Sequence, residues 1–378
     1  MSYGRPPGLF ARALLCVLAF RAMPLTAQTQ DGAVHLNEIQ VIGTHNSYHA
    51  GIPPGESKFW QTKAPALYSG LDYRHPSLTT QLSAGVRQLE LDIFADEKGG
   101  LYAHPAGPAL AAQAGFPADP DFDPGHIMDK PGFKVMHIQD VDYRSVCQPL
   151  VACLGEIRAW SKAHPKHVPL FILIETKQGP LHLDFPTTQP ESFTSATFDA
   201  LDREILSVFP KREIVTPDQV RGRSPTLAEA IRTHGWPTLA AARGKVVFLM
   251  DQRTMDPIYL ENHPALRGRI LFTNAEPGSP DAAFTEQNEG SPDQIAILVR
   301  QGYLVRTRTD ENTVEARNND TRRRDAVLPS GAQILSTDFP ASEPAATGFT
   351  VALPGRVVAR CNPVLRPKGC RDALLDLP

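Results

Sequence analysis

Histidines, carboxylates and a lysine follow several short apolar runs of this sequence, and these residue types transfer protons or bind metal ions. In V-I-G-T-H-N-S-Y-H, residues 41–49, His45 and Asn46 come directly after an apolar run. A histidine exchanges its proton near neutral pH, and an asparagine offers an oxygen to a metal ion. The stretch fits a catalytic position, and it also fits a loop in which the histidine only bonds its neighbours.

Two acidic residues are spaced to lie on one face of a strand. In L-E-L-D-I-F, residues 89–94, Glu90 and Asp92 are two apart, so both side chains point the same way. Adjacent carboxylates among apolar residues resist joint ionisation unless a cation offsets their charge. A hard cation such as calcium or magnesium suits these oxygen ligands. The alternative is a carboxylate pair that lines a solvated opening without a metal.

A third apolar run, P-L-F-I-L-I-E-T-K at residues 169–177, ends in Glu175 and Lys177, again on one face. The carboxylate could complete a metal site while the lysine holds a phosphate oxygen. An internal salt bridge between the two is the alternative.

Two further histidines compete as site candidates, although either one alone is more often structural than catalytic. His137 ends the run K-V-M-H and precedes a helical stretch that starts near Leu150. His104, in G-L-Y-A-H-P, lies twelve residues after Asp92.

The elements that carry these residues alternate between strand and helix, which predicts an α/β fold with a parallel sheet. Eight such units indicate a (β/α)8 TIM-type barrel, whose chemistry lies at the carboxyl ends of the strands. We expect one domain over residues 35–340 with a long insertion at 105–132, and a tail at 341–378. The predicted strands are 39–43, 86–94, 134–138, 170–175, 245–250, 270–273, 303–306 and 333–336, and the predicted helices include 150–162, 198–209 and 291–301.

Other polar residues also fall at predicted strand ends. We expect Gly43 and Thr44 to turn the chain after the first strand. The weaker site candidates are Asp251, Arg306, Arg308 and Asp338.

The net charge of −3 over 378 residues gives no field that would gather nucleic acid, so we expect no nucleic-acid partner, and we expect a monomer. Residues 1–27 have the layout of a signal peptide, with an apolar core too short to span a bilayer and small residues around Ala27. We therefore expect a secreted or periplasmic protein.

Four cysteines beyond this segment form two close pairs, which suits two local disulfides in an oxidising compartment. The pairs are Cys147 with Cys153, and Cys361 with Cys370. Two other pairings are possible, and a metal site is the alternative, although these spacings are not those of usual zinc ligands.

Taken in order, these motifs resemble the catalytic region of calcium-dependent phosphoinositide-specific phospholipase C, and most closely its secreted, single-domain bacterial branch. The resemblance covers roughly residues 38–340 and rests on G-T-H-N-S-Y, V-R-Q-L-E-L-D-I-F, the later strand histidine and P-L-F-I-L-I-E. The segment G-A-Q-I-L-S-T-D-F-P also resembles the last strand of glycerophosphodiester phosphodiesterase barrels.

The resemblance implies site roles. His45 would be the general base, and calcium, with magnesium as the alternative, would be bound by Asn46, Glu90, Asp92 and Glu175. It favours His137 as the second catalytic histidine because a helix follows it, although His104 has the family's spacing. Lys177 would stabilise the charged phosphate.

The implied reaction cleaves phosphatidylinositol-type lipids to diacylglycerol and a cyclic inositol phosphate, with transient contact at the membrane surface. Hydrolysis of glycerophosphodiesters on the same barrel is the alternative. A non-catalytic secreted binding protein is a further alternative, although such a protein would be expected to lose at least one of the histidines or acids.

Overall fold

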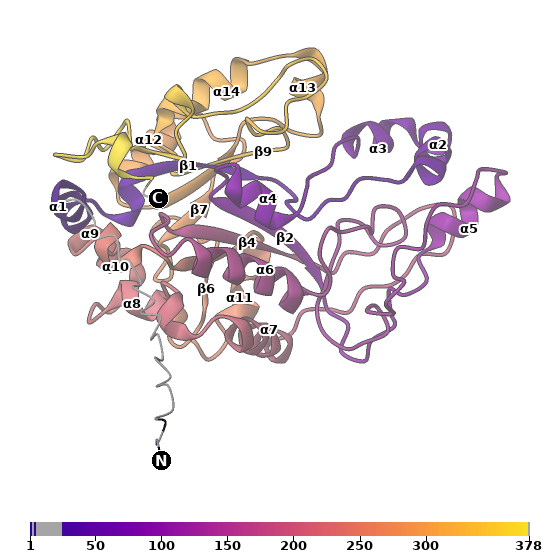
Figure 1. Ribbon diagram of the computed structural model, residues 1–378, viewed down its shortest axis with the longest axis horizontal. Coiled ribbons are helices and arrows are strands. Elements are labelled where there is room, and N and C mark those ends of the chain that lie inside the picture. Colours follow the sequence, from indigo (N-terminus) through magenta and orange to yellow (C-terminus); the bar gives the residue numbers. More distant parts are fainter. Residues whose placement is uncertain (2–3, 5–24, 377–378) are drawn as a thin grey trace.

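A barrel of parallel strands forms the body of the protein (Figure 1). The computed structural model describes residues 25–376, together with residues 1 and 4. Within these residues, eight parallel strands follow the order β6-β5-β4-β2-β1-β9-β8-β7, and a bridge from Asn274 to Phe284 links the two ends. The eight strands are β1 (Ile39–Thr44), β2 (Gln88–Phe94), β4 (Leu170–Lys177), β5 (Val246–Met250), β6 (Leu271–Phe272), β7 (Phe284–Glu286), β8 (Leu304–Arg308) and β9 (Ile334–Thr337).

The predicted (β/α)8 barrel is confirmed, but one of the predicted strands is wrong. Residues 134–138 do not form a barrel strand, because only Lys134–Val135 (β3) are extended and they pair antiparallel with the end of β2. The eighth barrel strand is β7, which the sequence did not reveal. It has three residues, too few to show a period of two.

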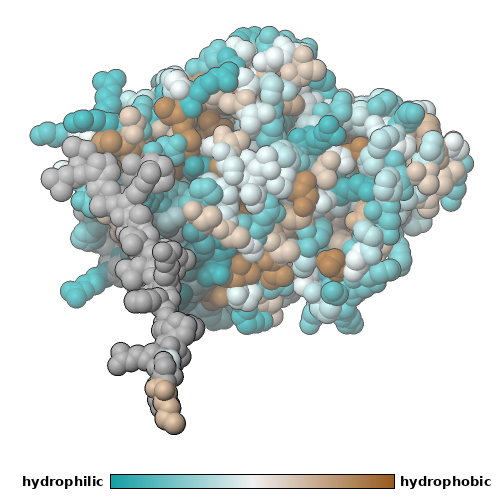
Figure 2. All heavy atoms as spheres, in the orientation of Figure 1, coloured by the Kyte–Doolittle hydropathy of each residue, from teal (hydrophilic) through white to brown (hydrophobic). Residues whose placement is uncertain are grey.

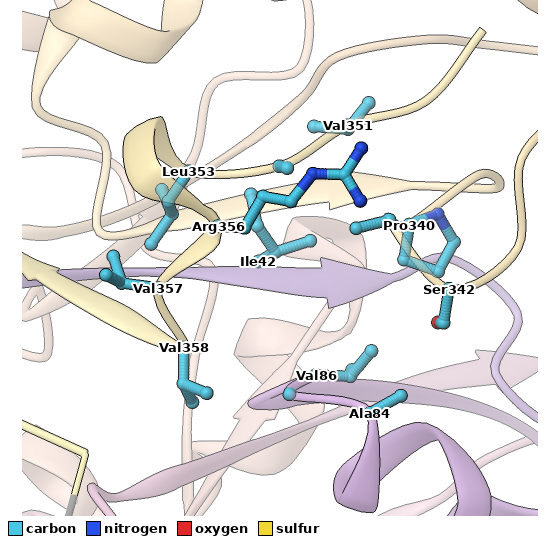
Figure 3. A pocket seen from close by; sticks show the side chains of 13 residues that line it. Ile42, Ala84, Val86, Pro340, Ser342, Val351, Leu353, Arg356, Val357 and Val358 are labelled. Carbon is cyan, nitrogen blue, oxygen red and sulfur yellow. The ribbon is translucent and has the colours of Figure 1, made fainter. Parts of the chain in front are cut away.

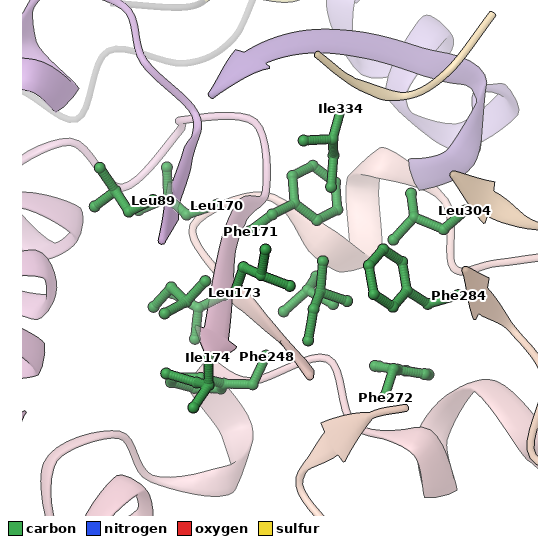
Figure 4. Packing of buried hydrophobic residues seen from close by; sticks show 14 of the residues in the cluster. Leu89, Leu170, Phe171, Leu173, Ile174, Phe248, Phe272, Phe284, Leu304 and Ile334 are labelled. Atoms are coloured by element: carbon green, nitrogen blue, oxygen red, sulfur yellow. The ribbon is translucent and has the colours of Figure 1, made fainter. Parts of the chain in front are cut away.

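Strand register decides which side chains fill the barrel. In β4, Phe171 pairs with Gln88 of β2 and with Val247 of β5, so alternate residues of neighbouring strands share the interior. Figure 4 shows Phe171, Phe284, Leu304 and Ile334 gathered in the space that the strands enclose. This apolar packing supports the polar residues that lie further along the same strands.

Gly43 lies inside β1 and does not turn the chain, which corrects that expectation. A Cβ atom at Gly43 would lie 1.9 Å from Oε1 of Gln88, so glycine makes room for this neighbouring side chain. The turn comes two residues after β1, where Asn46 has a φ of 44°, a left-handed conformation that asparagine tolerates.

Helices cover the outside of the barrel (Figure 1). The predicted helices 150–162, 198–209 and 291–301 correspond to α6, α7 and α12. The helices with their bounds are α1 (Leu25–Ala33), α2 (Pro54–Lys63), α3 (Pro65–Gly70), α4 (Leu78–Ser83), α5 (Ala106–Gln113), α6 (Leu150–Ala163), α7 (Ser195–Val208), α8 (Pro217–Arg221), α9 (Leu227–Thr233), α10 (Leu239–Ala242), α11 (Asp256–Tyr259), α12 (Pro292–Arg300), α13 (Val314–Asn318) and α14 (Arg322–Val327).

An arm extends beyond the barrel at the carboxyl end of its strands, built from α2 and α3 after β1 and from α5 after β2 (Figure 1). The arm has its own small core of Phe59, Trp60, Leu71, Ala111 and Val141. α5 belongs to the predicted insertion. The arm therefore stands beside the end of the barrel where we expect the chemistry.

The C-terminal segment packs back onto the barrel. Its strand β10 (Ala359–Cys361) pairs antiparallel with β1. The two predicted disulfides are confirmed, joining Cys147 to Cys153 and Cys361 to Cys370. Disulfides persist in oxidising compartments, which agrees with a protein that acts outside the cytosol.

No helix among residues 25–376 combines the length and hydrophobicity that a bilayer span needs. Hydrophobic residues on the face in Figure 2 occur in small separate groups among hydrophilic ones. The predicted signal peptide at residues 1–27 falls largely outside the described residues.

Candidate active site

Three carboxylates meet at the carboxyl ends of β2 and β4. Asp92 pairs in register with Glu175, and Glu90 lies two residues before Asp92 on the same face. One oxygen from each of Glu90, Asp92 and Glu175 lies within 4.8 Å of the others. Both residues of β2 are fully buried. The alternation of β2 and β4 therefore produces the acidic group that the sequence predicted.

Two basic side chains offset this charge. Nη2 of Arg306, which reaches across from β8, lies 2.5 Å from Oε2 of Glu90. Nζ of Lys177 lies 2.8 Å from Oε1 of Glu175 and 3.0 Å from Oδ2 of Asp92. The salt bridge considered for Glu175 and Lys177 is thus present, and it includes a third partner.

Burial and pairing shift the acids in different directions. Burial raises the pKa of Glu90 to about 7 although Arg306 opposes it. Burial, then the nearby charge of Glu175, raises the pKa of Asp92. Burial alone would raise the pKa of Glu175, but the ammonium of Lys177 outweighs it and holds this pKa at about 2. The three carboxylates together therefore carry more negative charge than a buried site, removed from water, favours.

The donor set fits a hard cation. Oε1 of Glu90 and Oδ1 of Asp92 are buried and, within the described chain, have no hydrogen-bond partner. Unpartnered buried carboxylate oxygens are costly, and calcium takes six to eight oxygen ligands. Asn46 is also buried; its amide donates to Tyr73, and its Oδ1 accepts from Tyr48 at 3.3 Å.

A carboxylate holds His45 from the side of the imidazole ring that faces away from the acidic group. Nδ1 of His45 lies 2.7 Å from Oδ1 of Asp338, just past β9, while Nε2 lies 3.7 Å from Oε1 of Glu90. An ionised Asp338 places the ring proton on Nδ1 and leaves the lone pair of Nε2 facing the acids. Burial lowers the pKa of His45, which keeps the ring neutral.

His137 has a matching arrangement. Its Nδ1 lies 2.9 Å from Oδ2 of Asp142, whose other oxygen is 2.8 Å from Nε2 of the buried His49. Burial would raise the pKa of Asp142, but the two histidines outweigh it and lower the pKa. Burial lowers the pKa of His137, and Asp142 opposes that shift.

His104 lies elsewhere. It is exposed and lines a hollow of about 330 Å³ beside Glu56, Asp119 and Arg144. Of the two competing histidines, His137 is the one that lies near His45, because its ring centroid is 6.1 Å from that of His49, four residues after His45.

Residues at the carboxyl ends of β5, β7 and β8 form the rest of the barrel opening. Asp251 and Glu286, together with Asn288, line a hollow of about 570 Å³. Nη1 of Arg306 lies 2.8 Å from Oδ1 of Asn288 and 3.4 Å from Oε2 of Glu286. The opening thus combines carboxylates, amides and basic groups that can bind a polyol or a phosphate.

A family model described as phosphoinositide phospholipase C, Ca2+-dependent, matches residues 34–363. The chain belongs to this family. The enzyme is therefore a phosphodiesterase that cleaves phosphatidylinositol-type lipids and depends on calcium. A comparison with curated protein sequences finds no match.

Solved structures agree on the fold. A calcium-dependent phosphoinositol-specific phospholipase C from Pseudomonas sp. is similar, with a TM-score of 0.54, 16% identity and coverage of 88% of this chain and 96% of that chain. The same comparison with a Ca2+-dependent phosphatidylinositol-specific phospholipase C from Streptomyces antibioticus gives a TM-score of 0.50, 18% identity and coverage of 81% and 95%.

Sequence reasoning missed the groups that hold the two histidines. Asp338 was only a weak candidate, and Asp142 and His49 were not considered. Asp142 follows His137 by five residues beyond a turn where Asp140 has a φ of 68°. The only sequence signal was the Q-D-V-D stretch itself, which is typical of a surface turn.

Arg306→Met tests the electrostatic balance of the site. Without calcium the variant should lose about 3–5 kcal/mol of unfolding free energy, because Glu90 is left buried without its partner. Saturating calcium should restore part of that loss by compensating the same carboxylate. Urea unfolding with calcium and with excess chelator measures both values.

The control for this test is Arg322→Met, because Arg322 is exposed and pairs only with Asp320 in its neighbourhood. It should change stability little under either condition. An equal loss for Arg306→Met with and without calcium would show that the metal does not act on Glu90.

Proposed function

We propose that His45 is the general base and His137 the general acid of phosphatidylinositol cleavage, and that Asn46, Glu90, Asp92 and Glu175 bind the calcium ion. The observation that carries this proposal is the arrangement of two partly buried histidines, each held through Nδ1 by its own carboxylate beside three clustered acids. Such pairing orients an imidazole and selects which nitrogen takes up a proton.

The base step follows from the tautomer of His45. Nε2 accepts the proton of the inositol 2-hydroxyl, and Asp338 stabilises the imidazolium that forms. The 2-oxygen then attacks phosphorus within the same molecule, so no separate nucleophile is needed.

The acid step belongs to His137. As the bond from phosphorus to the glycerol oxygen breaks, Nε2 of His137 donates a proton to that oxygen, and Asp142 stabilises the charged ring beforehand. The products are diacylglycerol and a cyclic inositol phosphate. Each proton transfer contributes roughly 10²- to 10⁴-fold to the rate.

Charge on the phosphate needs compensation as the reaction proceeds. When bound, calcium lowers the pKa of the attacking hydroxyl and offsets negative charge on the phosphate. Lys177 is held at the edge of the acidic group by Asp92 and Glu175, and we assign it to a phosphate oxygen. The positive group thus enters the reaction already oriented.

Product analysis tests the assignment of His45. The purified protein, incubated with phosphatidylinositol and calcium, should give a cyclic inositol phosphate in phosphorus NMR, and excess chelator should abolish it. His45→Ala should lower the rate by at least about 10²-fold. Cleavage of glycerophosphodiesters with phosphatidylinositol left intact would instead favour the alternative substrate.

Substitution of the two competing histidines tests the acid. His137→Ala should lower kcat by about 10²-fold or more, and His104→Ala should leave kcat close to that of the wild type, because His104 is exposed beside a different hollow. Steady-state kinetics on dispersed phosphatidylinositol distinguishes them. The reverse ranking would transfer the acid role to His104.

We also infer export after cleavage near Ala27, action as a monomer and transient contact with the membrane that holds the lipid substrate. Contacts made by α1 support this cleavage position, because Asp31 forms an ion pair with Arg243, and Gln30 bonds Arg371 of the C-terminal segment. Both residues remain if the chain starts after Ala27. N-terminal sequencing of the exported protein should begin there, and an intact Met1 would refute the cleavage.

A further inference from the structure

The backbone of His45 has an unusual buried partner. Nε2 of His75, which lies between α3 and α4, is 3.0 Å from the carbonyl oxygen of His45. The side chain of His75 is fully buried, and its backbone N–H donates to the carbonyl of His49 at 2.8 Å. The ring also packs edge-on against Tyr73, with centroids 5.6 Å apart. His75 is therefore fixed against the turn that carries His45.

The other ring nitrogen of His75 faces a carboxylate. Nδ1 lies 2.7 Å from Oε2 of Glu343, whose side chain is 16% exposed. A neutral imidazole has one N–H, whereas both nitrogens of His75 face oxygen acceptors. The two hydrogen bonds together need a proton on each nitrogen, and the charge of Glu343 stabilises the second one.

Glu343 lies beyond the last barrel strand, in a segment that is anchored at several points. Val351 donates its backbone N–H to the carbonyl of Phe339, and Arg324 lies over the ring of the buried Phe349. Figure 3 shows Pro340, Val351 and Leu353 of this segment around a crevice that Ile42 of β1 also lines. The segment is thus seated beside the strand whose end carries His45.

His75 also affects Asp338, the carboxylate that bonds Nδ1 of His45. Burial raises the pKa of Asp338 to about 6, and His75 is the largest of the positive charges that oppose this rise. An ionised Asp338 is what keeps the proton of His45 on Nδ1. His75 therefore acts on His45 in two ways. Its ring bonds the backbone carbonyl of His45, and its charge favours the ionised form of Asp338, the carboxylate partner of His45.

We propose that His75 and Glu343 are positioning residues for His45, because the ion pair between them holds the carbonyl of His45 and places a positive charge behind the Asp338–His45 pair. This inference rests on the proposed role of His45 as the base. Neither residue needs to touch the substrate. Their loss should lower kcat more than it changes KM or calcium affinity.

Two matched substitutions separate the contacts of His75. The amide nitrogen of glutamine corresponds in position to Nε2 and that of asparagine to Nδ1, so His75→Gln keeps the donor to His45 while His75→Asn keeps the donor to Glu343. We expect kcat to fall by at least about 10-fold in His75→Asn, which loses both the bond to His45 and the positive charge, since small misplacements of a catalytic group are costly. In His75→Gln, which loses the charge and keeps the bond, kcat should fall by less. KM and calcium affinity should stay within about twofold of the wild type.

Equal kcat for the wild type and both variants, with folding confirmed by thermal unfolding, would overturn the proposal. Glu343→Gln provides an interpretable variant if the changes at His75 prevent folding, because Glu343 is partly exposed and the glutamine amide has a similar shape and can donate to an unprotonated Nδ1. It should also lower kcat without altering KM.

NMR of protein labelled with ¹⁵N-histidine gives a readout independent of activity. The wild type should show two slowly exchanging ring N–H signals from His75, and Glu343→Gln should lose the one at Nδ1. A single ring N–H at His75 in the wild type would refute the ion pair. Unchanged activity in His45→Ala would refute the proposed base, and that result would leave the NMR signals as they are.

Discussion

The ion pairs between three buried acids and two basic side chains are the interaction on which the barrel opening depends. Glu90, Asp92 and Glu175 are brought together by the register of β2 and β4. Arg306 comes from the opposite wall, 216 residues along the chain, and its fully buried guanidinium bonds Glu90. Removing such charges from water costs several kcal/mol for each ion, so the pairs cannot be treated as a simple gain in stability. They hold a concentrated charge at the place where we propose that a metal and a phosphate bind.

That arrangement explains why both histidines have carboxylate partners of their own. In the roles that we propose, the three acids use their oxygens for the cation, whereas an imidazole that exchanges a proton needs a partner that fixes its tautomer. Asp338 and Asp142 provide these partners from two different places, the end of β9 and the loop after β3. The division lets the proposed metal ligands and the two histidines lie side by side without sharing carboxylate partners.

Much of this could be predicted from the sequence, where a periodic pattern or a strand end pointed to it. Glu90, Asp92, Glu175 and Lys177 follow from alternation on long apolar strands. Residues 134–138 were misassigned because an apolar run of that length fits a hairpin as well as a barrel strand. The partners of His45 and His137 could not be predicted from a periodic pattern. Asp338 is 293 residues from His45 along the chain, and Asp142, five residues from His137, is placed by an irregular turn at Asp140.

The active site also extends past the boundary of the barrel. Asp142 belongs to the segment between β3 and α6, and Glu343 to the segment after β9, so neither lies on a barrel strand. Barrel strands place catalytic groups rigidly, but loops and terminal segments must bring the outer partners, which is why these carry function more often than their irregular structure suggests. The pairing of β10 with β1 then has a second consequence, since it fixes the C-terminal segment to the same strand that ends at His45. A domain limit drawn at residue 340 from the strand pattern would therefore separate His45, the proposed base, from a group that bears on its geometry.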